Sequence, residues 1–153
     1  MVQTSWIESV KMFLGEFEYK IDEKGRVPVP PKFRIELKKD GLVLTQGIDT
    51  CITAYTTSEW KKLADSLTPG SVTRAKLRRL NRAIFATAFN LRIDGQGRVA
   101  LPITLRQFAG IEDEVVIVGA NTCFELWNKE LWAAEKATSQ EQAWQIIESL
   151  EQN

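Results

Sequence analysis

Two five-residue segments of this chain hold the residue types that can recognise a polyanion. The first, DEKGR, runs from Asp22 to Arg26, and the second, DGQGR, runs from Asp94 to Arg98. An arginine at the end of a short loop can hydrogen-bond guanine in the major groove or pair with a phosphate. The competing interpretation is an aspartate–arginine ion pair that only stabilises the loop. Both segments are therefore candidate DNA-contacting loops.

The other positions of the two segments favour tight turns. They also give the two loops different charges. Aspartate side chains hydrogen-bond nearby backbone N–H groups, and glycine adopts a positive φ without strain. Lys24 can contact a phosphate in the first loop, whereas Gln96 stands at the same position of the second. The two loops therefore need not bind DNA equally. The residues expected to organise the loops are Asp22, Asp94, Gly25 and Gly97.

A second pair of arginines follows the loops at equal distances. Arg34 lies eight residues after Arg26, and Arg106 lies eight residues after Arg98. Each belongs to a segment that begins with proline and then reads as a short helix. These arginines can contact phosphates or form intrachain ion pairs, and the sequence leaves both interpretations open.

The composition argues against catalysis. The chain of 153 residues has no histidine and two cysteines, so it lacks the commonest general base and the commonest zinc ligand. Paired acids such as Asp22 and Asp94 are the main support for an enzyme, and a loop role explains them more simply. We expect a non-enzyme with no metal, no cofactor and no small-molecule substrate. Without an apolar run long enough to span a bilayer or a signal peptide, a cytoplasmic location and no membrane partner are expected.

Charge is distributed unevenly along the chain although its net charge is zero. Residues 71–106 have a net charge of +7 and residues 107–153 a net charge of −7. One interpretation is a polyanion that binds the basic surface. The other is attraction between the two surfaces, within a subunit or head-to-tail between subunits, and we slightly favour it for the basic helix. The basic face of that helix holds Arg74, Arg78 and Arg82.

The chain contains a gapless internal repeat at an offset of 72 residues. Residues 17–60 align with residues 89–132, and thirteen of the aligned pairs are identical. A duplicated supersecondary unit is the natural explanation. A single copy of this size buries too little apolar surface to fold alone, so the two copies are expected to close around one shared core.

Each copy is expected to contain two hairpins with a short helix between them. In the first copy, the alternating segment 17–21 and the extended segment 27–29 flank the loop and predict the first hairpin. Pro28 suits only an edge or a bulge of a sheet. Residues 30–37 begin with proline and predict the helix. The second hairpin is predicted from residues 41–45 and 51–55, and from 115–118 and 123–127 in the second copy.

Two further helices are expected to follow the copies. The connector contains a predicted turn at Pro69-Gly70 and a helix from about Ser71, as its N-cap, to Ala86. Residues 139–151 predict a second amphipathic helix. The tryptophans are expected to be core or interface anchors rather than ligand stackers. The candidate oligomer-interface residues are Arg74, Arg78, Arg82, Trp60, Trp132 and Trp144.

These motifs resemble the MraZ family of bacterial transcriptional regulators, within the AbrB-like swapped-hairpin superfamily. The resemblance covers nearly the whole chain from Met12. It rests on MFLGEFEYKID, the two D-x-x-x-R loops, their VxVPxxFR and VALPxxLR continuations, and FELW followed by Trp132. It implies an α+β, mainly β fold: a pseudo-two-fold double AbrB-like β-barrel from two tandem repeats, with amphipathic helices after each repeat.

The resemblance also implies a function. Members of the family assemble into rings, bind short direct repeats upstream of the division and cell wall gene cluster and generally repress it. A homo-oligomeric ring on double-stranded promoter DNA, associated with the nucleoid, is therefore expected. The alternative is a protein–protein module without DNA, such as an antitoxin-like partner or a ring scaffold. The family's DNA-contacting arginine falls on Arg26 and Arg98. The neighbouring candidates for DNA contact are Lys24 and Gln96, and the candidate phosphate contacts are Arg34 and Arg106.

The expected organisation has five parts. Residues 1–11 precede the family's usual start and form an extension. Residues 12–60 are the first repeat, 61–88 the connector with the basic helix, 89–132 the second repeat and 133–153 the C-terminal helix.

Overall fold

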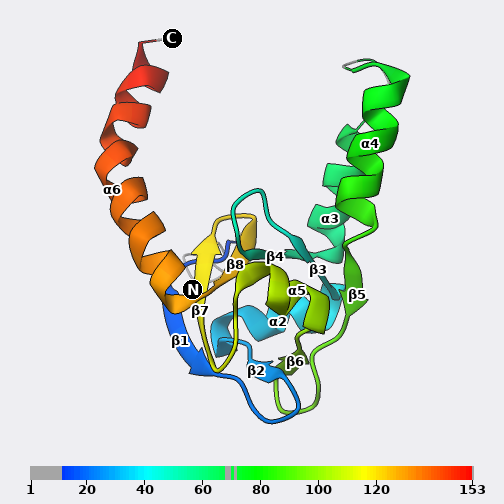
Figure 1. Ribbon diagram of the computed structural model, residues 1–153, viewed down its shortest axis with the longest axis vertical. Helices are drawn as coiled ribbons and strands as arrows, with labels where there is room; N and C mark the ends of the chain where they lie inside the picture. The colour runs from blue at the N-terminus through cyan, green and yellow to red at the C-terminus, as the bar shows by residue number, and fades with distance from the viewer. Residues whose placement is uncertain (1–11, 68–69, 71, 153) are drawn as a thin grey trace, which may run out of the picture.

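A computed structural model describes residues 12–67, 70 and 72–152 of the chain (Figure 1). The expected extension 1–11, together with Pro69 and Ser71 of the expected connector, lies outside the described residues. The described chain has a mixed α/β fold with antiparallel sheets. Its strands are β1 (Glu16–Lys20), β2 (Arg26–Pro28), β3 (Leu42–Gln46), β4 (Ile52–Thr56), β5 (Phe89–Leu91), β6 (Arg98–Ala100), β7 (Glu114–Ala120) and β8 (Cys123–Trp127). Its helices are α2 (Pro31–Asp40), α3 (Thr57–Ser66), α4 (Arg74–Phe85), α5 (Ile103–Ala109) and α6 (Lys129–Glu151).

Strand pairing joins the two repeats to each other. A six-stranded sheet has the order β1-β7-β8-β4-β3-β5, and β2 pairs with β6 in a separate two-stranded sheet. The predicted second hairpins are confirmed, because β3 pairs with β4 and β7 pairs with β8. The predicted first hairpins are wrong as pairings, because β1 pairs with β7 and β5 with β3. The strands on either side of each loop thus take partners from the other repeat, which lets both copies cover one core.

The short helices begin where the prolines predict. α2 begins at Pro31 and α5 follows Pro102, and proline is tolerated in a first turn because its missing N–H has no helical partner there. Pro28 lies opposite Arg98 in the two-stranded sheet, an edge position as expected.

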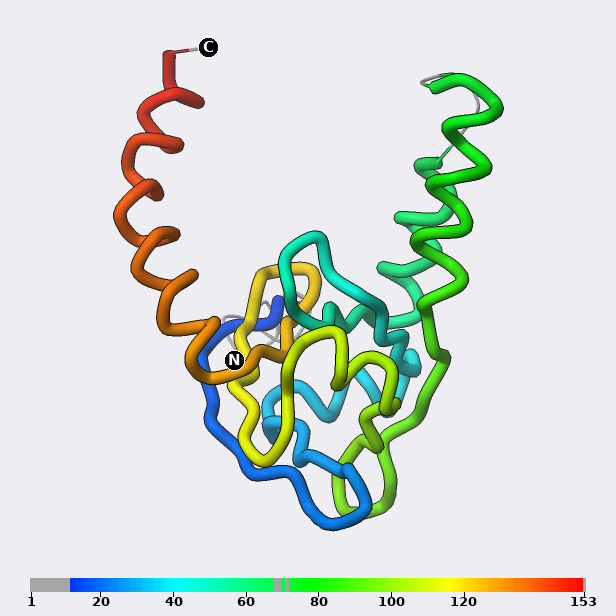
Figure 2. The backbone as a smooth tube through the Cα atoms, in the orientation of Figure 1, coloured from blue at the N-terminus to red at the C-terminus, as the bar shows by residue number. Residues whose placement is uncertain are grey.

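Two helical arms project from one side of the sheet core, as the ribbon and the tube both show (Figures 1 and 2). One arm is α6, which continues from β8. The other consists of α3 and α4, which run between β4 and β5 and lie against each other through the rings of Trp60 and Phe85 at a centroid distance of 5.2 Å. The loops before β2 and β6 lie at the opposite end of the molecule (Figure 1).

The bounds of the arm helices correct the sequence prediction. α4 begins at Arg74, and Thr73 caps it by accepting a hydrogen bond from the N–H of Lys76. α3 was not predicted. Its N-cap is Thr56, whose hydroxyl oxygen accepts a hydrogen bond from the N–H of Glu59. α6 begins at 129 rather than 139, after the cap residue Asn128. The tail helix therefore starts directly at the end of β8.

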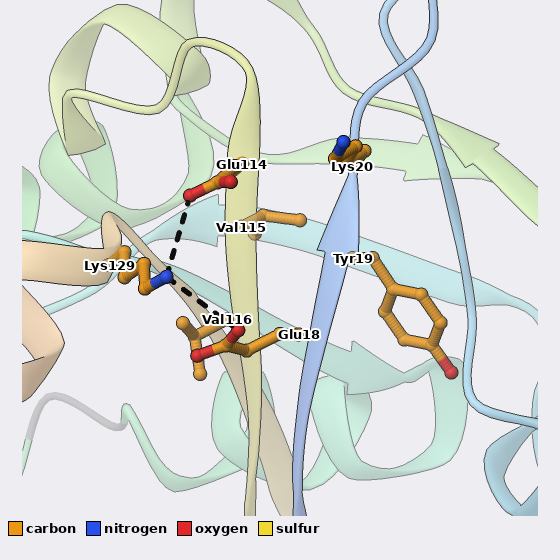
Figure 3. Close-up of a pocket in the computed structure, with 7 residues that line it drawn as sticks. All are labelled: Glu18, Tyr19, Lys20, Glu114, Val115, Val116 and Lys129. Carbon is orange, nitrogen blue, oxygen red and sulfur yellow. Dashed lines mark ion pairs between the residues drawn. The ribbon is translucent and has the colours of Figure 1, made fainter.

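Side chains of β1 and β7 fix the base of α6. Lys129 lies 3.8 Å from the carboxylates of both Glu18 and Glu114 (Figure 3). Further along, Lys136 pairs with Glu16 at 3.0 Å, and the indole N–H of Trp132 donates to the same carboxylate. The distal half of α6, from 137 onward, has only exposed residues among those described.

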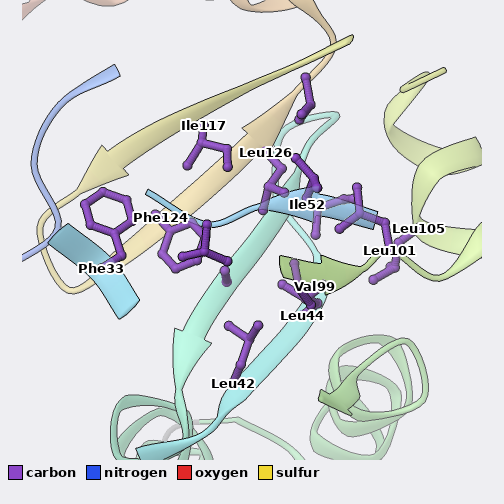
Figure 4. Close-up of a cluster of buried hydrophobic side chains, with 14 of the residues drawn as sticks. Phe33, Leu42, Leu44, Ile52, Val99, Leu101, Leu105, Ile117, Phe124 and Leu126 are labelled. Carbon is purple, nitrogen blue, oxygen red and sulfur yellow. The ribbon is translucent and has the colours of Figure 1, made fainter. Parts of the chain in front are cut away.

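One hydrophobic core lies between the sheets and the short helices (Figure 4). Phe33 of α2 packs against Phe124 of β8 with ring centroids 5.2 Å apart. Leu105 of α5 and Val99 of β6 belong to the same cluster. Because both repeats contribute buried side chains, the core positions both loops on a common support.

Candidate nucleic-acid interface

The first loop is closed by the carboxylate of Asp22. Its Oδ1 accepts hydrogen bonds from the backbone N–H groups of Lys24 and Arg26, each at 2.9 Å. Its Oδ2 accepts from Nε of Arg26 at 2.7 Å. The tight turn places Gly25 at φ 76°, a conformation that glycine adopts readily. Asp22 thereby organises both the turn and the arginine at its end.

The second loop repeats this geometry. Oδ1 of Asp94 accepts from the N–H groups of Gln96 and Arg98 at 2.9 Å, and Oδ2 accepts from Nε of Arg98 at 2.9 Å. Gly97 has φ 77°. The aspartate, glycine and arginine that the two loops share therefore form the same network of hydrogen bonds in both.

The structure brings the two loops together. Nη1 of Arg98 lies 3.8 Å from Oδ2 of Asp22, so one carboxylate faces the arginines of both loops. Backbone hydrogen bonds cross between the repeats, from Val29 N–H to Gly97 O at 2.8 Å and from Leu101 N–H to Gly25 O at 2.9 Å. The loops form one surface rather than two separate ones.

The arginine side chains remain accessible in this arrangement. The side chain of Arg26 is 30% exposed and that of Arg98 is 25% exposed. In each, the aspartate occupies Nε, which leaves donors on the terminal nitrogens. Lys24 and Gln96 are exposed beside them. The aspartate–arginine pair and an outer contact by the same guanidinium are therefore compatible.

Arg34 and Arg106 lie beside the loops, yet neither ion pair proposed for them forms with the described residues. Arg34 donates from Nε to the carbonyl of Val29 at 2.8 Å. Each guanidinium packs on the loop glycine of the other repeat. The equal spacing of glycine and arginine in both copies was the available signal, and sequence reasoning did not use it.

The interface candidates on the arms lie away from the loops. α4, which carries Arg74, Arg78 and Arg82, is at the opposite end of the molecule (Figure 1). Trp60 packs between Tyr55 and Phe85, and Trp132 packs on Trp127 with centroids 5.7 Å apart. Trp144 is 72% exposed. Those two inner tryptophans anchor the arms, whereas Trp144 lies on a free surface.

Hydrogen bonds in the loops lower the pKa of both aspartates. The largest cause for Asp22 is the N–H of Arg26, and for Asp94 it is the N–H of Arg98. Because the folded pKa lies below the unfolded one, these bonds stabilise the fold fully above the unfolded pKa, and the contribution is lost as pH falls through the folded pKa. We expect both carboxyls to titrate below the ordinary value of 3.8.

A carboxyl-carbon NMR titration checks this expectation, with Asp22→Asn and Asp94→Asn spectra to assign the two signals. A midpoint at or above 3.8 for either carboxyl in the folded protein would contradict the hydrogen-bonded geometry of that loop.

Over the residues that the structure describes, no group of three or more histidine, cysteine or carboxylate side chains is placed to hold a metal ion. Among the same residues, no helix is long and apolar enough to cross a membrane.

The protein is a duplicated antiparallel fold with two equivalent arginine-tipped loops, and comparison with known proteins identifies its family. The model of the family described as "MraZ protein, putative antitoxin-like" matches residues 12–83 and again residues 84–149. The chain belongs to the MraZ family. Each match contains one copy of the internal repeat.

Similar proteins carry the name "Transcriptional regulator MraZ". One from Dehalococcoides mccartyi strain BAV1 is 56% identical over 143 residues, which is 93% of this chain and 100% of that protein. One from Syntrophomonas wolfei is 40% identical over 91% of this chain and 96% of its own length. One from Thermomicrobium roseum is 42% identical over 81% of this chain and 87% of its own length. This similarity supports a role in transcription regulation and suggests a non-enzyme.

Proposed function

We propose that this protein is a sequence-specific DNA-binding repressor that contacts DNA with Arg26 and Arg98. The single observation that carries the proposal is the joint surface of two equivalent loops, each presenting a partly exposed arginine oriented by an aspartate. Such an arginine can hydrogen-bond the edge of guanine or pair with a phosphate. Lys24 extends the contact on one side and Gln96 on the other.

The proposed architecture is a double AbrB-like swapped-hairpin barrel. The pairing of β1 with β7, β5 with β3 and β2 with β6 supports it, because each repeat completes the sheet of the other. In this proposal the repeats are residues 12–60 and 89–132, the connector is 61–88, the C-terminal helix is 133–153, and residues 1–11 precede the first repeat.

The proposed targets are short direct repeats upstream of the protein's own gene, in the division and cell wall gene cluster. A protein with this role works in the cytoplasm, on nucleoid DNA. The loops with Arg34 and Arg106 have a net charge of only +2, so affinity from one subunit is small. A ring of subunits that contacts successive repeats supplies the remainder through avidity.

Charge on the arms supports self-assembly. α4 holds five basic residues and no acid, whereas α6 holds five acids and two lysines. Head-to-tail packing of α4 on α6 of the next subunit generates a ring if the rotation closes. High salt is expected to weaken such an assembly along with DNA binding.

The test is the binding of the wild-type protein, at moderate salt, to DNA from just upstream of its gene and to a scrambled sequence of the same composition. Tighter binding to the upstream DNA, by about 1,000-fold, is expected from the usual gap between specific and non-specific affinity. Equal affinity in a correctly assembled protein would favour the second candidate, a protein–protein module. The exposed apolar side chains of α6 and the antitoxin-like description of the family favour that candidate.

A further inference from the structure

Arg34 and Arg106 reach across from one repeat to the loop of the other. A Cβ built on Gly97 would lie 2.5 Å from Cζ of Arg34, and a Cβ built on Gly25 would lie 3.3 Å from Cζ of Arg106. Each guanidinium therefore fills the space that a side chain would take at the opposite glycine. Because α2 and α5 are anchored in the shared core through Phe33, Leu37, Leu105 and Ala109, these arginines tie each loop to the core from the other side.

The loop glycines accordingly have two roles. Both are buried and both have a positive φ, so the turn needs glycine. Both also accept a backbone hydrogen bond from the other repeat, Gly97 from Val29 and Gly25 from Leu101. The contact with the opposite arginine thus forms where the two repeats already meet. In each loop this place is next to the loop's own arginine, Arg26 or Arg98.

The two contacts are not equivalent. Nε of Arg34 donates to the carbonyl of Val29 at 2.8 Å, whereas Nε of Arg106 is buried without a hydrogen-bond partner among the described residues. A buried N–H without an acceptor is unfavourable for folding. Stability alone therefore does not explain an arginine at 106, and a role at the loop surface does.

We propose that Arg34 and Arg106 are positioning residues of the DNA interface, each fixing the loop of the other repeat. Arg106 acts on DNA through Arg26, and Arg34 acts through Arg98. The inference rests on the proposed function and differs from both interpretations that the sequence left open for these arginines, phosphate contacts and intrachain ion pairs. Each loop is then held by a side chain from the repeat of the other.

The test introduces Arg106→Met into the wild type, into Arg26→Ala and into Arg98→Ala, and measures affinity for the upstream DNA. Coupled neighbours show non-additive effects, so Arg106→Met is expected to lower affinity about tenfold in the wild type and in Arg98→Ala, and less than about twofold in Arg26→Ala. Arg106→Lys is expected to behave as Arg106→Met, because an ammonium cannot lie flat on Gly25. Equal losses in all three backgrounds with rescue by lysine would overturn the proposal in favour of a direct phosphate contact.

A second measurement needs no DNA. NMR-detected hydrogen exchange in Arg106→Met is expected to accelerate at the amides of Lys24 and Arg26, which close the first loop, and not at those of Gln96 and Arg98. Exchange that is unchanged, or accelerated equally in both loops, would overturn the positioning role. Exchange that accelerates only in the first loop, together with a DNA affinity that Arg26→Ala does not change, would overturn the proposed function. The positioning of the loop by Arg106 would still hold.

The symmetric variant guards against a folding artefact. Arg34→Met is expected to accelerate exchange in the second loop and to couple to Arg98→Ala rather than to Arg26→Ala. A folded Arg34→Met with the opposite pattern would overturn the proposal even if Arg106→Met failed to fold.

Discussion

Affinity for the upstream DNA is expected to fall about 100-fold or more when Arg26 and Arg98 are both replaced by alanine. A well-formed arginine–guanine contact contributes about 1–3 kcal/mol, and the two loops supply two such contacts per subunit. The fold is expected to survive, because both arginines are partly exposed and their pairs with Asp22 and Asp94 are surface ion pairs of small net value. The measurement is a binding titration at fixed moderate salt.

The matched control removes two positive charges from the other end of the molecule. Lys61→Ala with Lys62→Ala changes exposed residues of α3, so it is expected to alter affinity by less than about threefold, through long-range electrostatics alone. A double arginine variant that is folded, correctly assembled and still binds the upstream DNA tightly would contradict the loop site. The basic face of α4 would then be the next candidate.

The chemistry of the loops was predictable from the sequence because it is local. Aspartate, glycine and arginine within five residues determine a turn, its positive φ and the side chain at its end, and these interactions need no knowledge of the fold. The repeat added that the same turn occurs twice. The sequence did not show that the two turns are neighbours, since nothing in a five-residue pattern specifies what lies across from it.

Strand partners were less predictable than strand positions. Alternation identifies which face of a strand is buried, but β1 and β2 have the same pattern whether they pair with each other or with the other repeat. The shared core decides the matter, since pairing β1 with β7 places Phe17 and Tyr19 beside Ile117 and Val115. The same reasoning applies to Arg34 and Arg106. Their contacts with the loop glycines form because strands of one repeat pair with strands of the other.

The missed helix α3 had a local signal. Thr56 and Glu59 have the spacing of a capping box, and the structure confirms the cap from Thr56 to the N–H of Glu59. The early start of α6 also had a local signal, because the side chain of Asn128 caps the helix by accepting a hydrogen bond from the N–H of Leu131. Its first turns make tertiary contacts that the sequence did not show. Lys129 and Trp132 reach acids of β1 and β7 that are distant in sequence.

The exposed distal half of α6 leads to the second large expected effect. Its side chains include Trp144 at 72%, Ile147 at 42% and Leu150 at 69% exposure. Their spacing of three residues places them on one side of the helix, and exposed apolar groups gathered in this way indicate a contact surface. The acidic residues of α6 and the basic residues of α4 identify a second copy of this chain as the proposed occupant. Trp144→Glu with Leu150→Glu is therefore expected to convert the assembly into small species, as measured by light scattering after size exclusion.

Loss of assembly has a specific consequence for DNA. In the proposed ring, the avidity that linked sites provide is worth about 100-fold or more, and a dissociated subunit loses it. The affinity of the glutamate variant for DNA with several repeats is expected to fall by that factor, while its affinity for a single repeat stays within about twofold of wild type. Its loops, at the other end of the molecule, are unchanged.

The control places the same charges on the other side of the same helix. Gln145 of α6 and its C-cap residue Gln152 are exposed and lie away from the apolar residues at the helical period. Gln145→Glu with Gln152→Glu is therefore expected to leave the assembly intact. If the Trp144 and Leu150 variant keeps the wild-type mass, the apolar surface of α6 does not hold the subunits together. If it dissociates and binds several repeats as tightly as wild type, avidity is not the source of affinity, and the loops of one subunit, which together with Arg34 and Arg106 have a charge of +2, must supply it.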